Sequence, residues 1–227
     1  MRGIATLAAV AALVVFAAPH SRASAQEAKA PQLLVDEATA VVTELSADPH
    51  FDDIAQYIAR AKAVMVVPQL LKAGFIIGGE MGDAVVLSRT ADGSWSSPAF
   101  YSLIGGSIGF QAGAEAQQII IAVMTDKGLN ELMSNQFEFG VDASIAVGEV
   151  GGGVGAGSVG SLKADFVAFS RSKGLFGGGA FDGTLIRPQV DENSAYYGAG
   201  TTPKQILIDK TVSNQGAGRL KAALKVR

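Results

Sequence analysis

The sequence contains no cysteine and only two histidines among its 227 residues. Without cysteine, the chain has no disulfide, no thiolate metal ligand and no cysteine nucleophile. His20 lies in the N-terminal apolar segment discussed below, so His50 is the one histidine of the remaining chain. A zinc site would then depend mainly on carboxylates, which is unusual for zinc. We therefore expect neither a metal nor a cofactor.

Enzyme motifs occur only as partial matches. G-x-S-x-G surrounds Ser107, but the hydrolase triad that this motif serves needs a histidine further along the chain, and His50 lies before it. G-x-G-x-x-G occurs at 155–160, where the next regular segment indicates a strand instead of the helix that a dinucleotide site requires. The acidic pairs at 52–53 and 191–192 lack the spacing of a calcium loop. We expect a protein that is not an enzyme, with a carboxylate-based hydrolase as an alternative.

A long apolar run is found only near the N-terminus. Arg2 precedes an apolar stretch at 4–18, and Ala-Ser-Ala at 23–25 fits the small-x-small pattern of a signal-peptide cleavage site. The stretch is shorter than the ~20 residues of a membrane-spanning helix. We therefore predict a cleaved signal peptide at 1–25 and an exported protein, periplasmic or secreted, that is soluble after cleavage.

Positive charge is scarce outside the C-terminal region. Loss of Arg2 and Arg22 with the signal peptide changes the net charge from −3 to −5. This balance provides no broad basic face, so we expect no nucleic-acid partner. From residue 204 on, however, six basic residues accompany a single acid, Asp209. A basic end on an acidic body is compatible with an anionic membrane surface, although an ordinary solvated terminus has the same composition.

Glycine, by contrast, is abundant. The chain has 28 glycines, many of them inside apolar runs, which favours bulged or tightly turned β-structure. Asp-Gly at 92–93 predicts a hairpin between two such runs. The ranges that we expect to form strands are 63–67, where Pro68 ends the strand, 74–79, 84–89, 100–110, 117–124, 137–147, 166–170 and 180–186.

Helical patterns lie on both sides of these strands. Apolar residues recur at helical spacing over 34–45, and a second helix is expected to begin at Asp48 and Pro49, which suit a cap and a first helical position. We expect a short helix at 126–134, a polar turn at 191–198 and a small basic amphipathic helix at 218–227.

The order of these elements predicts an α+β fold. An N-terminal helix pair is expected to pack on a curved, mostly antiparallel, glycine-rich sheet or partial barrel. We expect one domain at 34–210, preceded by a leader at 26–33 and followed by a basic tail at 211–227.

Six ordered blocks of the sequence resemble a known family. They are K-A-V-M-V-V-P at 62–68, K-A-G-F at 72–75, D-G-S-W-S-S-P at 92–98, G-G-S-I-G-F-Q-A-G at 105–113, S-K-G-L-F-G-G from 172 with the glycines up to 183, and N-S-A-Y-Y-G at 193–198. In these blocks the chain is similar to the SYLF domain, also called the Ysc84 actin-binding or DUF500-type domain, over roughly 34–208.

The resemblance implies a binding function. Eukaryotic members are associated with phosphoinositide-rich membranes and some of them with actin filaments, whereas exported bacterial members are described as lipid-binding proteins. Because an exported protein would not meet cytosolic actin, we expect actin to be an unlikely partner.

Our leading hypothesis is a non-enzymatic protein that binds anionic phospholipid surfaces through basic side chains next to apolar ones. Each surface Lys or Arg contributes ~1 kcal/mol near an anionic leaflet, so several together give reversible binding. The alternative is a structural or protein-interaction module of the cell envelope that self-associates through a sheet edge or its glycine-rich segment. Trp95 and Phe181 are expected in the core. The candidate lipid-binding residues are Lys62, Lys72, Phe75, Arg171, Lys173, Leu175, Phe176, Arg219, Lys221 and Lys225.

Overall fold

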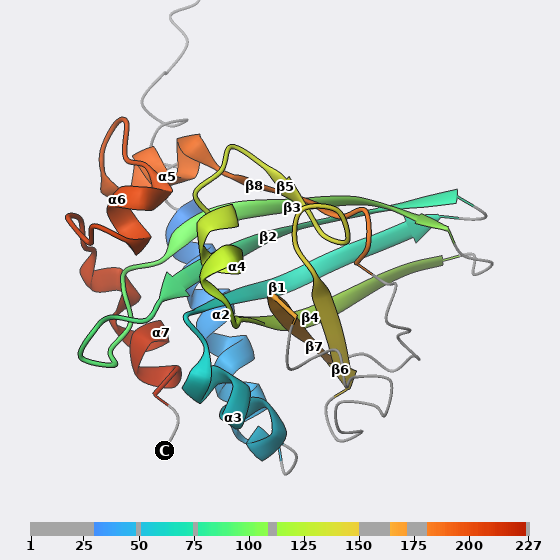
Figure 1. Cartoon of the computed structure of the whole chain (residues 1–227), viewed down its shortest axis with the longest axis horizontal. Helices are drawn as coiled ribbons and strands as arrows, with labels where there is room; N and C mark the ends of the chain where they lie inside the picture. Colours follow the sequence, from blue (N-terminus) through green and yellow to red (C-terminus); the bar gives the residue numbers. More distant parts are fainter. Residues whose placement is uncertain are drawn as a thin grey trace, which may run out of the picture.

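The structure, a computed structural model, describes residues 30–48, 51–74, 77–108, 113–149, 164–171 and 181–225. Two helices come first, and strands follow, with short helices after the fourth strand and at the end (Figure 1). The helices are α2 (Ala30–Ser46), α3 (Phe51–Arg60), α4 (Asp126–Glu131), α5 (Val190–Tyr197), α6 (Pro203–Leu207), the 3₁₀ helix η2 (Gln215–Ala217) and α7 (Gly218–Ala223). The strands are β1 (Ala63–Gly74), β2 (Ile77–Ser88), β3 (Ala99–Ile108), β4 (Gly113–Val123), β5 (Phe137–Glu138), β6 (Ile145–Glu149), β7 (Phe166–Arg171) and β8 (Leu185–Pro188).

The strands form one eight-stranded sheet in the order β5-β8-β3-β2-β1-β4-β7-β6. Neighbouring strands are antiparallel except β6, which pairs parallel with β7. The sheet curls, and β5, β6 and β7 lie away from the plane of the long strands (Figure 1). The predicted α+β fold, with an N-terminal helix pair and a curved, mostly antiparallel sheet, is confirmed.

The sheet is buried on both faces along one half of its long strands, which we call the near half (63–67, 84–88, 99–103 and 119–123). Alternate residues of β1 enter two different cores, as strand geometry requires. Met65 belongs to a core on the inner face together with Phe137 and Phe166, whereas Val64 and Val66 belong to a second core. The second core lies on what we call the helix face, because side chains of α2, α3 and the α7 region pack there against those of the strands.

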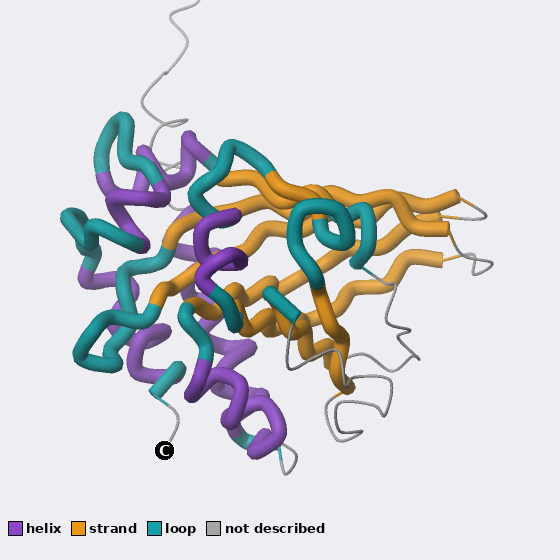
Figure 2. The backbone as a smooth tube through the Cα atoms, in the orientation of Figure 1, coloured by secondary structure: helices purple, strands orange, loops and turns teal. Residues whose placement is uncertain are grey.

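The other half of the long strands, the far half (69–74, 77–83, 104–108 and 113–118), extends beyond the helices (Figure 2). β1 reaches it by passing through Pro68, with a register shift between Val67 and Leu70 against β4 and between Val66 and Gln69 against β2. The strand therefore does not end at Pro68 as the sequence indicated. Proline has no N–H for the ladder, and a bulge at this point lets the strand continue.

Several local predictions are met. Trp95 and Phe181 are buried in the helix-face and inner cores, respectively. The hairpin at 92–93 forms, with Gly93 at φ 81°, a left-handed conformation that favours glycine, and with a bridge between Arg89 and Trp95. The segment at 191–198 differs from the prediction, because it forms α5 instead of a turn.

The C-terminal segment is integrated into the fold. Leu220 and Leu224 of the α7 region are buried in the helix-face core, and the Trp95 indole donates a hydrogen bond to the carbonyl of Leu224 at 3.1 Å. The helix therefore uses its apolar side to pack on α2 and the hairpin. None of the helices in the described ranges is long and apolar enough to span a bilayer.

Candidate functional site

Helix α7 presents the basic residues of the C-terminal segment to solvent. Arg219 and Lys225 are exposed and Lys221 is partly exposed, and within the described part of the chain none of the three forms an ion pair. Leu220 and Leu224 point the other way, into the core. The exposed side of α7 is therefore cationic without large apolar side chains, so it can attract an anionic surface but has nothing to insert into it.

A network around Arg89 joins α7 to the end of α3. The Arg89 guanidinium donates to the carbonyl oxygens of Ala61 at 3.0 Å and Ile58, and lies 4.2 Å from the centre of the Trp95 ring. Partial burial lowers the pKa of Arg89 from its usual high value. Because Trp95 also bonds to Leu224, the C-terminal ends of α3 and α7 meet at this guanidinium.

We call this region the basic end, and define it by Arg60, Lys62, Arg89, Lys210, Arg219, Lys221 and Lys225. The Lys210 ammonium lies 3.4 Å from the carbonyl oxygen of Arg89, which places it in the same network. Acidic residues also lie here. Asp126 pairs with Lys62 at 2.8 Å, and Asp92 lies in the adjoining hairpin, where hydrogen bonds from Thr90 and Ser94 lower its pKa to about 2. Positive charge remains in excess.

Lys62 and Lys72, both candidate lipid-binding residues, lie far apart. Lys62 directly precedes β1 and Lys72 lies ten positions further along the strand, which corresponds to roughly 30 Å at the rise of a β-strand. Lys72 lies in the far half on the inner face, where its ammonium pairs with the carboxylate of Glu80 at 2.9 Å and lies 5.4 Å from the centre of the Phe181 ring. Its side chain is 18% exposed, so its charge is directed to Glu80 and not to the basic end.

The remaining predicted residues cannot be joined to either group. Arg171 is the last residue of β7, opposite Gln118 of β4. Phe75, Lys173, Leu175 and Phe176 lie outside the described residues. The basic and apolar corner between the two strands at 166–170 and 180–186 therefore stays a prediction, and the C-terminal basic residues with Lys62 form the cluster that the structure describes.

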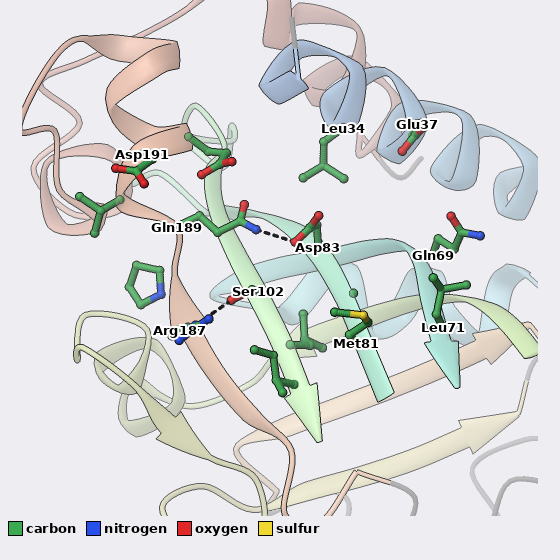
Figure 3. A pocket seen from close by; sticks show the side chains of 16 residues that line it. Leu34, Glu37, Gln69, Leu71, Met81, Asp83, Ser102, Arg187, Gln189 and Asp191 are labelled. Carbon is green, nitrogen blue, oxygen red and sulfur yellow. Dashed lines mark hydrogen bonds between the residues drawn. The ribbon is translucent and has the colours of Figure 1, made fainter. Parts of the chain in front are cut away.

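A groove on the helix face is the second candidate, and the sequence analysis did not identify it. It has a volume of about 630 Å³ and lies between the end of the α2 layer, the β8–α5 junction and the far half of β1, β2 and β3 (Figure 3). Leu71, Met81 and Ile104 form its apolar floor, and Leu34 of α2 points toward them from above.

The rim of this groove is acidic. Glu37, Asp83, Asp191 and Glu192 line it, with Arg187 as the single base. Asp83 accepts a hydrogen bond from the Gln189 amide, and Arg187 donates to the Ser102 hydroxyl at 3.3 Å, so neither residue is neutralised by an ion pair within the described part of the chain. The groove thus combines negative charge with exposed apolar side chains, the opposite chemistry to that of the basic end.

The sequence did carry a signal for the groove. In strand segments that alternate between two faces, residues 69, 71, 81, 83, 102 and 104 share the face of Val64 and Val66, and three of them are large apolar side chains. To place these residues on one face, one must know that β1 has a bulge at Pro68 and that β1 pairs with β2. Neither fact is apparent in the sequence alone.

The described residues also bear on catalysis and metal binding. No group of three or more His, Asp or Glu side chains suited to a metal is found among them. Ser107, the centre of the G-x-S-x-G match, lies in β3 opposite Gly78 of β2, which is a ladder position and not the strand-to-helix turn of a nucleophile elbow. The G-x-G-x-x-G match at 155–160 lies outside the described residues.

Comparisons with known proteins identify similar sequences. The family model described as "Ysc84: Las17-binding protein actin regulator" matches residues 104–227. Protein YSC84 of Saccharomyces cerevisiae is 29% identical over 174 residues, 75% of this chain and 37% of that protein. LAS seventeen-binding protein 3 of the same species is 31% identical over 154 residues, 66% of this chain and 33% of that protein. SH3 domain-containing YSC84-like protein 1 of Mus musculus is 30% identical over 146 residues, 63% of this chain and 42% of that protein.

These relatives are longer proteins, and the chain spans between about a third and under half of the length of each. No solved structure matches the chain.

One expectation is corrected by these comparisons. We expected actin to be an unlikely partner, and this was wrong, because the matching family is described as an actin regulator and a relative is named for binding Las17. The expectation depended on the compartment inferred from residues 1–25, which lie outside the described residues. Compartment is therefore no basis for excluding actin.

Proposed function

The chain belongs to the Ysc84 family of Las17-binding protein actin regulators, and from this premise we propose that it is a non-enzymatic binding protein whose basic end attaches to anionic phospholipid surfaces. The observation that carries the proposal is the exposed cationic side of α7, where Arg219, Lys221 and Lys225 have no ion-pair partner in the described structure. At ~1 kcal/mol for each basic residue near an anionic leaflet, this cluster supports reversible association.

The attachment that we propose is electrostatic. Because Leu220 and Leu224 are held in the core, α7 contributes charge and not inserted apolar surface. Binding of this kind weakens steeply with salt, since the Debye length falls from ~10 Å at 0.1 M to ~3 Å at 1 M. Lys72 is not part of the proposed surface, because Glu80 holds its ammonium in the far half.

The test is co-sedimentation of the chain from Gln26 onward with vesicles of phosphatidylcholine alone or mixed with phosphatidylglycerol. We expect binding to the anionic vesicles only, with loss at high salt. The single variant Lys225→Glu is expected to weaken it by about thirtyfold, since reversal changes the local charge by two and each charge is worth ~1 kcal/mol. Arg187→Glu, an equal reversal in the acidic groove, serves as the matched control and should leave binding unchanged.

Absence of binding at low salt, or equal weakening by the two reversals, would refute the proposed surface. An arm with actin filaments in place of vesicles belongs in the same experiment, because the family description makes actin a candidate partner of this chain. Binding to filaments but not to vesicles favours the protein-interaction alternative. A hydrolase or a dinucleotide-dependent enzyme would turn over a substrate. We expect no turnover by this chain.

We also propose that the protein acts outside the cytoplasm. The support is the signal-peptide pattern at 1–25. Expression of the full chain in a bacterium with an export pathway, followed by mass measurement, is expected to give a protein that begins at Gln26. An uncleaved chain in the cytoplasmic fraction would contradict this proposal and leave the lipid test unaffected.

A further inference from the structure

The floor of the acidic groove is a row of exposed apolar side chains in adjacent strands. Leu71 of β1 lies opposite Met81 of β2, and Met81 lies opposite Ile104 of β3. Their exposed fractions are 45%, 60% and 39%. Directly opposed side chains on one sheet face are neighbours, so the three form one continuous surface.

This surface is the part of the helix face that no helix of the described structure covers. In the near half, Val64, Val85 and Phe100 on the same face are fully buried beneath α2, α3 and α7. In the far half the strands continue beyond that layer, and α2 contributes only Leu34 and Glu37 at the margin of the groove (Figure 3). The groove is thus placed where a further helix would extend the layer.

The rim indicates the charge of such a helix. Glu37 lies on α2 at one side of the groove, Asp191 lies on the other side with Arg187, and Asp83 lies between them on β2 (Figure 3); Glu192 also lines the groove. Four carboxylates against one guanidinium repel an anionic ligand and attract a cationic one. A phospholipid surface with negative headgroups is therefore the wrong ligand for this groove.

We propose that the groove binds a cationic amphipathic helix of a partner protein. Neighbouring strands lie ~4.8 Å apart, so the row from Leu71 to Ile104 is about 10 Å wide, which matches the ~10–12 Å diameter of a helix with its side chains. The apolar side of the helix covers Leu71, Met81 and Ile104, and its Lys or Arg residues meet the carboxylates of the rim. This interaction is separate from the lipid proposal, because it uses the opposite half of the sheet and the opposite charge.

The probe is a fluorescent peptide of about 18 residues, five turns of helix, with leucine at helical spacing and lysine elsewhere. A second peptide with glutamate in place of lysine controls for charge. Fluorescence anisotropy, without vesicles, measures binding of each to the chain from Gln26 onward. We expect the lysine peptide to bind and the glutamate peptide not to bind.

Two variants localise the binding. Met81→Ser removes the most exposed side chain of the floor and is expected to weaken binding by about tenfold, since burial of such a side chain is worth ~1.5–3 kcal/mol. Val141→Ser is the matched control, because Val141 is 72% exposed and lies outside the groove. Glu192→Gln is expected to weaken binding by about two- to fivefold at low salt, as for an exposed charge pair, whereas Glu131→Gln on α4 should have no effect.

The competing outcomes are distinct. No binding of the lysine peptide, or binding that Met81→Ser and Val141→Ser affect equally, would overturn the proposal. Sedimentation velocity of the chain alone provides a further test: a dimer that Met81→Ser converts to monomer would assign the groove to a second copy of this chain and also overturn it. Both serine variants change exposed side chains, so we expect them to unfold at the same temperature as the unmodified protein.

Discussion

The two halves of the long strands differ in what covers them. In the near half both faces are buried, and β1, β2 and β4 read as apolar runs (A-V-M-V-V, A-V-V-L and I-I-I-A-V). In the far half the same strands carry Gln69, Lys72, Glu80 and Asp83, and their helix face holds the exposed row of the groove. The near half therefore lies in the core, whereas the far half leaves apolar side chains of its helix face exposed.

The inner face of the far half departs from this division, because it buries a charge. Glu80 is 3% exposed, accepts a hydrogen bond from the Thr184 hydroxyl and pairs with Lys72. Gly105 makes room for it, since a Cβ at that position would lie 2.7 Å from the Glu80 carboxylate. The far half is thus open on the helix face and tightly arranged on the inner face.

The largest effect is expected in the core on the inner face, which covers the near half. Phe166→Ala removes a fully buried ring that stacks on Phe137 and contacts Phe139 edge-on, with ring centroids 5.5 and 5.0 Å away. We expect the free energy of unfolding to fall by about 3–5 kcal/mol, measured by urea denaturation. The corresponding exposed residue of the far half, Met81, should tolerate Met81→Ala within about 0.5 kcal/mol. Similar losses at both positions would remove the contrast between the halves.

A smaller effect is expected at the buried ion pair. Lys72→Met keeps the length of the side chain but leaves the carboxylate of Glu80 without its cation, so the unfolding free energy should fall by about 1–3 kcal/mol. The double variant Lys72→Met/Glu80→Gln should recover part of this loss, because it removes the unpaired charge. If Lys72→Met were as stable as the unmodified protein, the inner face of the far half would contribute as little to stability as its helix face.

Asp165 directly precedes β7, whose first residue Phe166 pairs with Val123 of the near half, and it gives a pH-dependent prediction. Burial raises the pKa of Asp165, but hydrogen bonds from the Thr125 hydroxyl at 2.6 Å and from the Ser144 amide and hydroxyl outweigh it, so the pKa lies below its usual value. A lowered pKa in the folded state means that this contribution to stability is present above the unfolded-state value of about 3.9 and is lost as pH falls through the folded-state value.

We expect Asp165→Asn to reduce the unfolding free energy by about 1 kcal/mol at pH 7, and the difference from the unmodified protein to narrow below about pH 4. Denaturation at several pH values measures both. A difference that is constant with pH would show that the carboxylate charge has no role at this junction of α4, β6 and β7.

The smallest effect on stability is expected at the basic end. Lys225→Glu changes an exposed side chain after the last turn of α7, and we expect a change within about 0.5 kcal/mol in urea denaturation. Its effect on vesicle binding should be much larger than its effect on stability. If stability and binding fell together, the loss of binding would report unfolding of α7 instead of lost charge.

The sequence predicted the near half better than the far half for a physical reason. Apolar runs and Asp-Gly at 92–93 are local signals, and they located the cores of the long strands, the hairpin and both N-terminal helices. The continuation of β1 past Pro68 depends on a bulge, and α5 at 190–197 is fixed by contacts distant in sequence. Asn193, for example, exchanges hydrogen bonds with the backbone of Phe100 in β3.

The binding surfaces were predicted only in part for the same reason. The basic character of α7 follows directly from composition, but the partners of Lys62 and Lys72 are Asp126 and Glu80, and only the folded chain brings them together. The groove needs three strands, α2 and the β8–α5 junction in register, so no local pattern contains it.

The bond between Trp95 and Leu224 has a consequence for the order in which the protein is made. Leu220 and Leu224 complete the core beneath α2, yet they leave the ribosome nearly two hundred positions after α2 begins. The helical layer therefore closes only when synthesis has passed residue 224, and a chain stopped a few residues earlier would leave the Trp95 indole and the adjoining leucine sites open to water.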